Sequence, residues 1–355
     1  MILLKGYVSN NLGDDLFFEY VSQRYPNTKF YLRGSKKYNN SFLSCANLEM
    51  INPSFVKILY NKLLRKMRGK YIDIYTHPKN IETCLTIGGS IFMQNLYWES
   101  ELSIFAKQLQ RYDTNIILGC NFGPFNSEEY INQYSDLFEQ VDDICFRDKY
   151  SYNLFKKSTK VRYAPDILFG LNPIKASTEK TILISVIKPS IRKNLMKFDE
   201  LYYEGIYSFA KKYLKENYQI QLVSFCKNEG DEEAVENIFG RFSSNEQRSI
   251  KKVFYDGTNR EGILNLIAES EIIVATRFHA MILGWVHNKK VLPIIYSDKT
   301  LNVIKDLSFN GRYVDLRERK TNYDISLSEI GKLENIDEII NESYKHFKVL
   351  DKYLK

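Results

Sequence analysis

The sequence has few cysteines, and it lacks any long apolar run. The cysteines are odd in number, far apart, and form no Cys-x-x-Cys pair: Cys45, Cys84, Cys120, Cys145 and Cys226. This pattern indicates neither a disulfide framework nor a zinc site, so we expect most of these thiols to be buried in strands. The sequence also shows no metal-binding cluster and no redox-cofactor motif, so we expect no cofactor. No stretch stays uncharged over the length of a membrane span.

Charge and targeting signals restrict the partners only a little. The N-terminus reads Met-Ile-Leu-Leu-Lys, which is too short an apolar run for a signal peptide, and we expect a cytoplasmic protein. A net charge of +7 on 355 residues is modest. Nucleic acid is one candidate partner, but the aromatic residues are spread evenly and no nucleic-acid motif accompanies the charge. A membrane surface or an anionic substrate fits the charge equally well, and we expect no nucleic acid.

The order of apolar runs predicts the fold class. Short β-branched runs alternate with helical patterns, which is typical of parallel sheets covered by crossover helices. The expected strands are 2–6, 29–32, 83–87, 116–119, 144–147, 161–164, 181–186, 220–225, 252–255, 272–275 and 291–295. The prediction is an α/β protein with two doubly wound, Rossmann-like domains that face a central cleft.

The segment FGLNPIKASTEK, residues 169–180, is the best candidate for a linker because it combines Gly, Pro and Ser with a polar end. We therefore predict an N-terminal α/β domain at 1–172, a C-terminal α/β domain at 178–330, and a C-terminal helix at 331–355 that packs back. Ligands of such sheets bind at the carboxyl ends of the strands, so the loops that follow strands carry the candidate sites.

The loop GYVSNNLGDD follows the first strand but does not suit a nucleotide phosphate. Its glycines, Gly6 and Gly13, are seven residues apart, and Asp14 and Asp15 stand where the phosphate would bind. The two carboxylates can simply cap the helix and favour its dipole. Alternatively, Asn10, Asn11 and one aspartate bind sugar hydroxyls, or a carboxylate takes a hydroxyl proton.

An anion site is predicted in the second half of the chain. Arg277 and His279 follow the expected strand 272–275 and precede a helix, and all three features favour an anion. Arginine can grip a phosphate or carboxylate with two hydrogen bonds, and histidine can deliver a proton near neutral pH. Structural ion pairing explains the same pattern. The other histidines, His77, His287 and His346, are predicted to be ordinary surface or cap residues.

Other loops after strands add candidates for the acceptor side. Gly88, Gly89 and Ser90 follow one strand, where small residues let a ligand or a backbone come close. Asn121 in GCNFGPF follows the next strand, and Asp166 in YAPDILF ends another. Turn geometry alone can explain the glycines.

Eight segments in order resemble the polysaccharide pyruvyl transferase family: GYVSNNLGDD, LTIGGS, GCNFGPF, CFRDKYS, YAPDILF, ISVIKPS, IVATRFHAMI and IIYSDK. The family is similar in fold to two-domain glycosyltransferases of the B type. The resemblance implies transfer of pyruvate from phosphoenolpyruvate onto two hydroxyls of a sugar, as a cyclic ketal, in a polysaccharide of the bacterial cell envelope or its lipid-linked precursor. It places the donor in the C-terminal domain and the acceptor in the N-terminal domain.

The resemblance also implies roles for single residues. Arg277 and His279 would contact phosphoenolpyruvate, with Lys188 or Arg192 in place of a family arginine and Lys299 of IIYSDK beside them. His279 is the expected acid. The base is Asp14, Asp15 or Asp166.

Two other functions fit the sequence, and residues 55–71 have two interpretations. A glycosyltransferase of the same shape would need a nucleotide-sugar site, and a saccharide-binding relative without activity would not need Arg277 and His279. Residues 55–71 hold six basic and no acidic residues, with apolar residues at helical spacing. They can form a helix that covers the domain with a solvated basic face, or a helix that lies on an anionic membrane.

Overall fold

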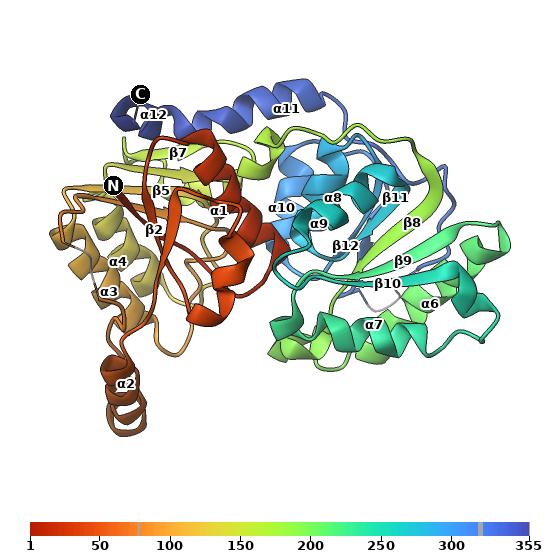
Figure 1. The fold of residues 1–355 in the computed structure, drawn as a ribbon, viewed down its shortest axis with the longest axis horizontal. Coiled ribbons are helices and arrows are strands. Elements are labelled where there is room, and N and C mark those ends of the chain that lie inside the picture. Colours follow the sequence, from red (N-terminus) through yellow and green to blue (C-terminus); the bar gives the residue numbers. More distant parts are fainter. Residues whose placement is uncertain (77–78, 319–321, 355) are drawn as a thin grey trace. The chain divides into compact units, whose positions relative to one another are not determined.

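The computed structural model describes residues 1–76, 79–318 and 322–354 (Figure 1). The chain forms two compact units. Unit 1 comprises Met1–Val8, Leu16–Ile167 and Asn341–Lys355, and unit 2 comprises Ser9–Asp15 and Leu168–Ile340. Each unit is built around one parallel sheet.

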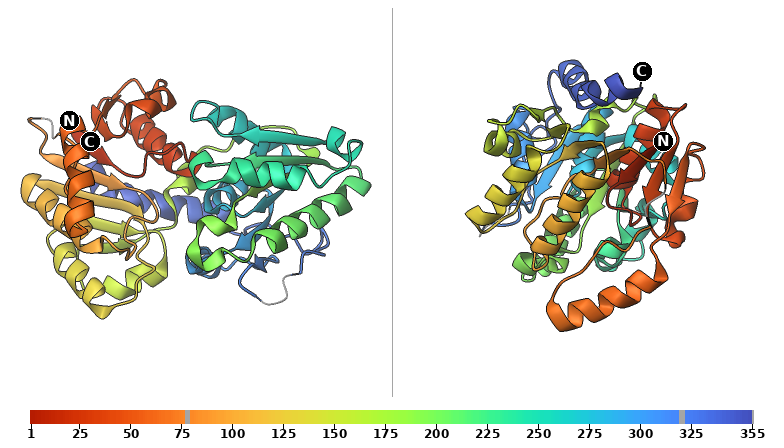
Figure 2. Two further views of the ribbon diagram at one scale, coloured as in Figure 1. Left: turned by 90° about the horizontal axis from the view of Figure 1, so that it is seen from below. Right: turned by 90° about the vertical axis from the view of Figure 1, so that its left-hand side faces the viewer.

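The sheet of unit 1 has the strand order β3-β2-β1-β4-β5-β6-β7, and every pair is parallel. Its strands are β1 Ile2–Lys5, β2 Phe30–Arg33, β3 Leu48–Ile51, β4 Thr83–Ile87, β5 Thr114–Cys120, β6 Asp143–Phe146 and β7 Val161–Tyr163. Helices lie on both faces of this sheet (Figure 2). The helical segments are α1 Leu12–Arg24, η1 Lys36–Phe42, α2 Phe55–Arg68, α3 Trp98–Arg111, α4 Glu128–Phe138, α5 Lys149–Phe155, η7 Tyr344–Lys348 and α12 Leu350–Leu354.

The sheet of unit 2 has the order β10-β9-β8-β11-β12-β13 and is also parallel. Its strands are β8 Glu179–Val186, β9 Gln219–Ser224, β10 Ile250–Phe254, β11 Ser270–Ala275, β12 Lys290–Ile295 and β13 Val314–Asp315. The helical segments are η2 Ile167–Gly170, η3 Pro189–Ile191, η4 Lys193–Leu195, α6 Asp199–Lys215, η5 Lys227–Glu229, α7 Asp231–Phe239, η6 Glu246–Ser249, α8 Arg260–Glu269, α9 Phe278–Val286, α10 Asp298–Asp306 and α11 Ile336–Ser343.

The central strands are apolar along most of their length because both of their faces are covered. The last six residues of β8 and of β5 are all buried. Continuous burial of this kind is typical of parallel sheets between two helical layers. In both sheets the strand order reverses beside the first strand, at β1/β4 and at β8/β11, where ligands of doubly wound sheets bind.

The predicted α/β class with two doubly wound sheets is confirmed, and all eleven predicted strands are present. Strands β3 and β13 were not predicted. All five cysteines are buried and unpaired, and Cys84, Cys120 and Cys145 lie in strands as expected.

Two parts of the chain differ from the prediction. Residues 9–15 pack with unit 2 although the predicted boundary assigns them to the first domain, because their backbone binds the end of β9. Helix α2 does not cover the sheet with its apolar side and extends away from the rest of unit 1 (Figure 1). The interpretation of 55–71 as a covering helix with a solvated basic face is therefore wrong.

Candidate functional site

Arg277 lies two residues after the end of β11, at the point where the strand order of unit 2 reverses. Its backbone N–H donates to the Ser185 hydroxyl at the end of β8, 3.2 Å away, and it is the N-cap residue of α9. The side chain is buried. The structure therefore fixes this arginine at the switch point of the sheet, as predicted from its place after a strand.

Two carboxylates hold the guanidinium of Arg277: Glu229 at the end of η5 and Asp231 at the start of α7. Asp231 accepts hydrogen bonds from Nε, at 2.9 Å, and from Nη2. It also accepts from the backbone N–H groups of Phe225 and Cys226, at 3.1 and 2.9 Å. Glu229 accepts from Nη1 at 2.7 Å. The Nε edge of Arg277, which would grip a donor anion, thus faces Asp231.

Neither carboxylate was predicted. Both lie in the segment CKNEGDEE after β9. The sequence could have indicated them, because they stand between the end of a strand and the start of a helix, as Arg277 does.

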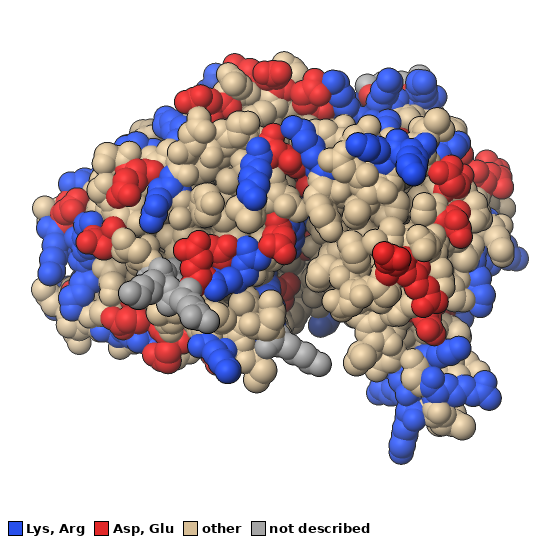
Figure 3. All heavy atoms as spheres, turned by 180° about the vertical axis from the view of Figure 1, so that it is seen from behind, with Lys and Arg blue, Asp and Glu red and all other residues tan. Residues whose placement is uncertain are grey.

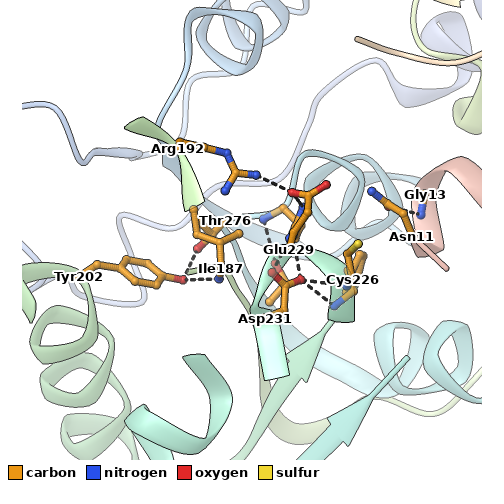
Figure 4. Close-up of polar contacts among 12 residues, drawn as sticks. Asn11, Gly13, Ile187, Arg192, Tyr202, Cys226, Glu229, Asp231 and Thr276 are labelled. Atoms are coloured by element: carbon orange, nitrogen blue, oxygen red, sulfur yellow. Dashed lines mark hydrogen bonds and ion pairs between the residues drawn. The ribbon is translucent and has the colours of Figure 1, made fainter. Parts of the chain in front are cut away.

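Further cations surround this pair. Arg192 donates from Nη2 to Glu229, 2.7 Å away, as Figure 4 shows. The Arg192 guanidinium also lies 4.5 Å from the ring centre of Tyr296. Lys188 pairs with Glu233, and Lys299 lies 6.0 Å from the ring centre of Phe278. The cluster thus holds four positive charges, on Arg277, Arg192, Lys188 and Lys299. It holds three negative charges, on Glu229, Asp231 and Glu233.

The nearby cations lower the pKa of two groups here, the buried Tyr296 and the partly buried Glu229. Burial would raise the pKa of Tyr296, but Lys299, Arg192 and Arg277 lower it overall. Burial would also raise the pKa of Glu229, and Arg277 and Arg192 lower it instead. Both shifts favour the negative form of the group, whereas burial raises the pKa of Asp231 in the same cluster despite the nearby Arg277.

The opening loop is part of unit 2 and is tied to the same strand end. Leu12 donates its N–H to the carbonyl of Phe225 at 3.1 Å, and Asn11 forms a β-bridge with Cys226. Asn10 donates through Nδ2 to the carbonyl of Asp256 at 3.0 Å. Asn10 has a φ of +50°, a conformation that asparagine tolerates better than most residues. The loop, predicted from the sequence as a polyol site, therefore shares a unit with Arg277.

Gly13 and His279 are in close contact. A Cβ atom built on Gly13 would lie 1.7 Å from Nδ1 and 2.3 Å from Cγ of His279. The imidazole therefore lies against the backbone of the first turn of α1, a contact that only glycine permits. Figure 4 shows Asn11 beside Gly13, and the amide oxygen of Asn11 accepts from the Gly13 N–H at 3.2 Å. His279 is half-buried.

The three candidate bases differ in their surroundings. Asp15 is fully buried and accepts a hydrogen bond from the Tyr255 hydroxyl at 2.8 Å. Asp166 is also fully buried and pairs with Arg147 of unit 1 at 2.9 Å. Asp14 is partly exposed in the first turn of α1, next to Gly13. Asp14 is thus the one of the three with access to solvent.

The remaining acceptor candidates gather around Arg147 in unit 1. Arg147 donates through Nη2 to the Asn121 amide oxygen at 2.9 Å, and the Ser90 hydroxyl donates to the same oxygen at 3.2 Å. A Cβ atom on Gly89 would lie 2.3 Å from Nη2 of Arg147. Gly88, with φ of +148°, precedes them. The structure brings these residues together, and turn geometry explains Gly88.

The other histidines are only partly as predicted. His287 follows α9 as its C-cap residue. His346 is fully buried rather than at the surface, and its Nε2 donates to the carbonyl of Pro165 at 2.9 Å. The prediction failed because the C-terminal segment packs on unit 1, where Arg162 also binds its carbonyls. His77 lies outside the described residues.

Sequence comparison decides the family. The model of the family described as polysaccharide pyruvyl transferase matches residues 11–298. The chain belongs to this family. A curated relative, the amylovoran biosynthesis protein AmsJ of Erwinia amylovora, is 21% identical over 295 residues, which cover 76% of this chain and 70% of AmsJ. Membership of the polysaccharide pyruvyl transferase family makes the chain a transferase of polysaccharide biosynthesis, which confirms the resemblance seen in the eight segments.

Comparison with solved structures gives the fold. UDP-GlcNAc 2-epimerase from Neisseria meningitidis is similar with a TM-score of 0.57, at 11% identity, over 99% of this chain and 100% of the other. Sucrose-phosphate synthase from Thermosynechococcus elongatus gives 0.56, at 10% identity, over 99% and 98% of the two chains. This polysaccharide pyruvyl transferase family member thus has the GT-B type of two-domain α/β fold.

Proposed function

We propose that this protein transfers the pyruvyl group of phosphoenolpyruvate onto two hydroxyls of one sugar, in a cell-envelope polysaccharide or its lipid-linked precursor. The observation that supports this most is the cluster at the carboxyl end of β8 and β11. There His279 lies on Gly13, close in sequence to Arg277, and the cations lower the pKa of Tyr296. Under this proposal, the cluster would supply an acid and an anion site within one unit.

The donor would be held mainly by Arg192, Lys188 and Lys299. Arg192 and Lys188 are partly exposed, whereas Arg277 is buried against Asp231. Arg277 would then contribute charge and keep Glu229 and Asp231 in place. A phosphate and a carboxylate on one small molecule are bound better by several neighbouring cations than by the guanidinium of a single arginine.

The chemistry needs one acid and one base. A proton from His279 to the methylene carbon of phosphoenolpyruvate makes the central carbon electrophilic, and the first sugar hydroxyl attacks it as Asp14 takes the hydroxyl proton. The C–O bond to phosphate then breaks, and the second hydroxyl attacks the same carbon to close the ketal. Of the two hydroxyl protons lost, one replaces the proton given by His279 and one leaves with phosphate.

The roles of Asn10 and Asn11, and of Gly88, Gly89, Ser90 and Asn121, in acceptor binding stay predictions. The amides and the hydroxyl are groups that bind sugar hydroxyls, and those of Asn121 and Ser90 are already ordered by Arg147.

Donor binding tests the proposal without knowledge of the acceptor. Phosphoenolpyruvate should raise the melting temperature, because a ligand at 100 times its Kd adds about 2.7 kcal/mol to the free energy of unfolding. Arg192→Ala and Lys299→Ala should abolish the rise. Lys215→Ala, which removes an exposed lysine of α6 in the same unit, should keep it.

The same measurement separates the alternatives. A rise with a nucleotide sugar and none with phosphoenolpyruvate would replace this proposal with glycosyl transfer. A rise with neither donor, together with a rise with oligosaccharides, would point to a saccharide-binding relative without activity.

A further inference from the structure

Helix α2 is held to the rest of unit 1 by polar contacts. The side-chain amide of Asn61 donates to the carbonyl of Ile72 at 2.7 Å and accepts from its N–H at 2.8 Å. The Lys57 ammonium donates to the carbonyl of Tyr75 at 2.8 Å. Asn61 is the buried residue of this helix. The side of α2 that faces the protein is therefore hydrophilic at its closest contacts.

The opposite side of α2 is apolar and exposed. Six large side chains of α2 are between 49% and 74% exposed and recur at helical spacing: Phe55, Val56, Leu59, Tyr60, Leu63 and Met67. A helix that covers a globular core places such a stripe inward. Here the stripe points outward, and an exposed apolar stripe on an otherwise polar surface marks an interaction site.

The charge of the segment identifies the partner. Residues 55–71 contain six basic and no acidic residues. Lys62 and Lys66 are exposed and follow Leu59 and Leu63 by three positions, so the cations border the apolar stripe. Figure 3 shows Lys and Arg gathered on the projecting helix.

A pocket beside the helix has the same character. It lies between α2 and α3, has a volume of about 570 Å³, and is lined by five cations: Lys57, Arg68, Lys70, Lys107 and Arg111. Two carboxylates also line it, which leaves a cationic excess of three. A pocket of this size accommodates an anionic headgroup.

We propose that α2 docks this protein on an anionic lipid bilayer. The stripe of Leu59, Leu63 and Met67 enters the interface, Lys62 and Lys66 lie at the headgroups, and the pocket between α2 and α3 receives one phosphate. A second copy of the chain is a poorer occupant, because pairing two α2 helices would bring two sets of six cations together. Among the helices within 1–76, 79–318 and 322–354, none is long and apolar enough to cross a membrane.

Vesicle co-sedimentation of the full chain tests the docking. The protein should bind mixed phosphatidylcholine–phosphatidylglycerol vesicles, bind phosphatidylcholine alone far less, and dissociate as salt is raised. Lys62→Gln with Lys66→Gln should weaken binding by about 10- to 30-fold. Leu59→Gln with Leu63→Gln should weaken it as well, because the exposed stripe and not the charge alone enters the interface. Arg65 is left intact because it lies 4.9 Å from the ring centre of Tyr71.

Matched variants control for charge and apolar area elsewhere on the same unit. Lys156→Gln with Lys157→Gln removes two exposed cations beyond α5, and Leu43→Gln with Leu96→Gln removes two exposed leucines. Both should bind as the parent protein does. Equal binding of neutral and anionic vesicles, or unchanged binding of the α2 variants, would overturn the docking. So would self-association in sedimentation that α2 variants abolish while no vesicles bind.

Discussion

At the residue scale, the structure gives Arg277 and His279 different tasks. Arg277 is buried and its hydrogen bonds go to Asp231 and Glu229, so its first role is to hold a charged cluster together. His279 is half-buried and lies on a glycine, which leaves an imidazole at the edge of the site. The sequence motif alone cannot separate these tasks.

Substitution should separate them in the test tube. His279→Gln should lower kcat by about 10²- to 10⁴-fold with little change in phosphoenolpyruvate affinity, because glutamine cannot deliver the proton. Arg277→Lys should instead lower the free energy of unfolding by about 1.5 to 3 kcal/mol, since the charged hydrogen bonds to Asp231 are lost. Urea unfolding and turnover per folded molecule are measured on both. A fully active, well-folded His279→Gln protein would end the acid assignment.

At the element scale, the central strands of each sheet could be predicted from the sequence, whereas the edge strands β3 and β13 could not. Strands such as β8 and β11 are continuous apolar runs, because both faces are covered. β3 is half-exposed and β13 has two residues, so neither has the pattern of a buried strand. The loops after strands could be chosen from sequence. The side chains that pair with residues in these loops could not be predicted. Asp231 and Arg277 are 46 residues apart in the sequence, and the pairing of β8 with β9 and β11 brings them together.

The contact between α1 and α9 gives the element-scale prediction. In Gly13→Ala the new methyl group would overlap the His279 ring, so the imidazole must move. Activity should fall at least 10-fold, as displacements of about 1 Å at reacting groups cost up to about 10²-fold. The melting temperature should fall as well, because the new methyl group would also lie 2.7 Å from Cβ of His279, so activity is compared per folded molecule.

Gly262→Ala in α8 is the matched control. A Cβ atom there meets nothing within 4 Å, so this variant should gain stability and keep full activity. Full activity of Gly13→Ala would show that the position of His279 on Gly13 does not matter for turnover.

At the scale of the whole molecule, the end of the chain completes the first unit. Residues Asn341–Lys355 belong to unit 1, although most of the preceding chain belongs to unit 2. Asp351 accepts hydrogen bonds from Arg24, the last residue of α1, and from the following Tyr25, at 2.9 and 2.6 Å. Unit 1 therefore combines residues from both ends of the sequence, and its stability depends on how this segment docks.

His346 makes that docking sensitive to pH. The pKa of His346 is lowered from the ordinary 6.5 to about 3. Burial is the main cause, and the positive charge of the neighbouring Arg162 also contributes. The unfolded chain takes up a proton below about pH 6.5 and the folded chain does not, so stability is full above that pH and falls as the pH drops toward 3. At about pH 5 the loss from this residue is about 2 kcal/mol.

Urea unfolding at about pH 7.5 and about pH 5 measures this loss. His346→Gln should be less stable than the parent protein at the higher pH, because its fit against Pro165 is worse, but the difference between the two pH values should shrink by about 2 kcal/mol. Lys352→Gln, which removes an exposed charge from α12, should keep the parent difference. If His346→Gln loses as much stability on acidification as the parent does, other groups carry the acid sensitivity and the neutral, buried state of His346 is not its cause.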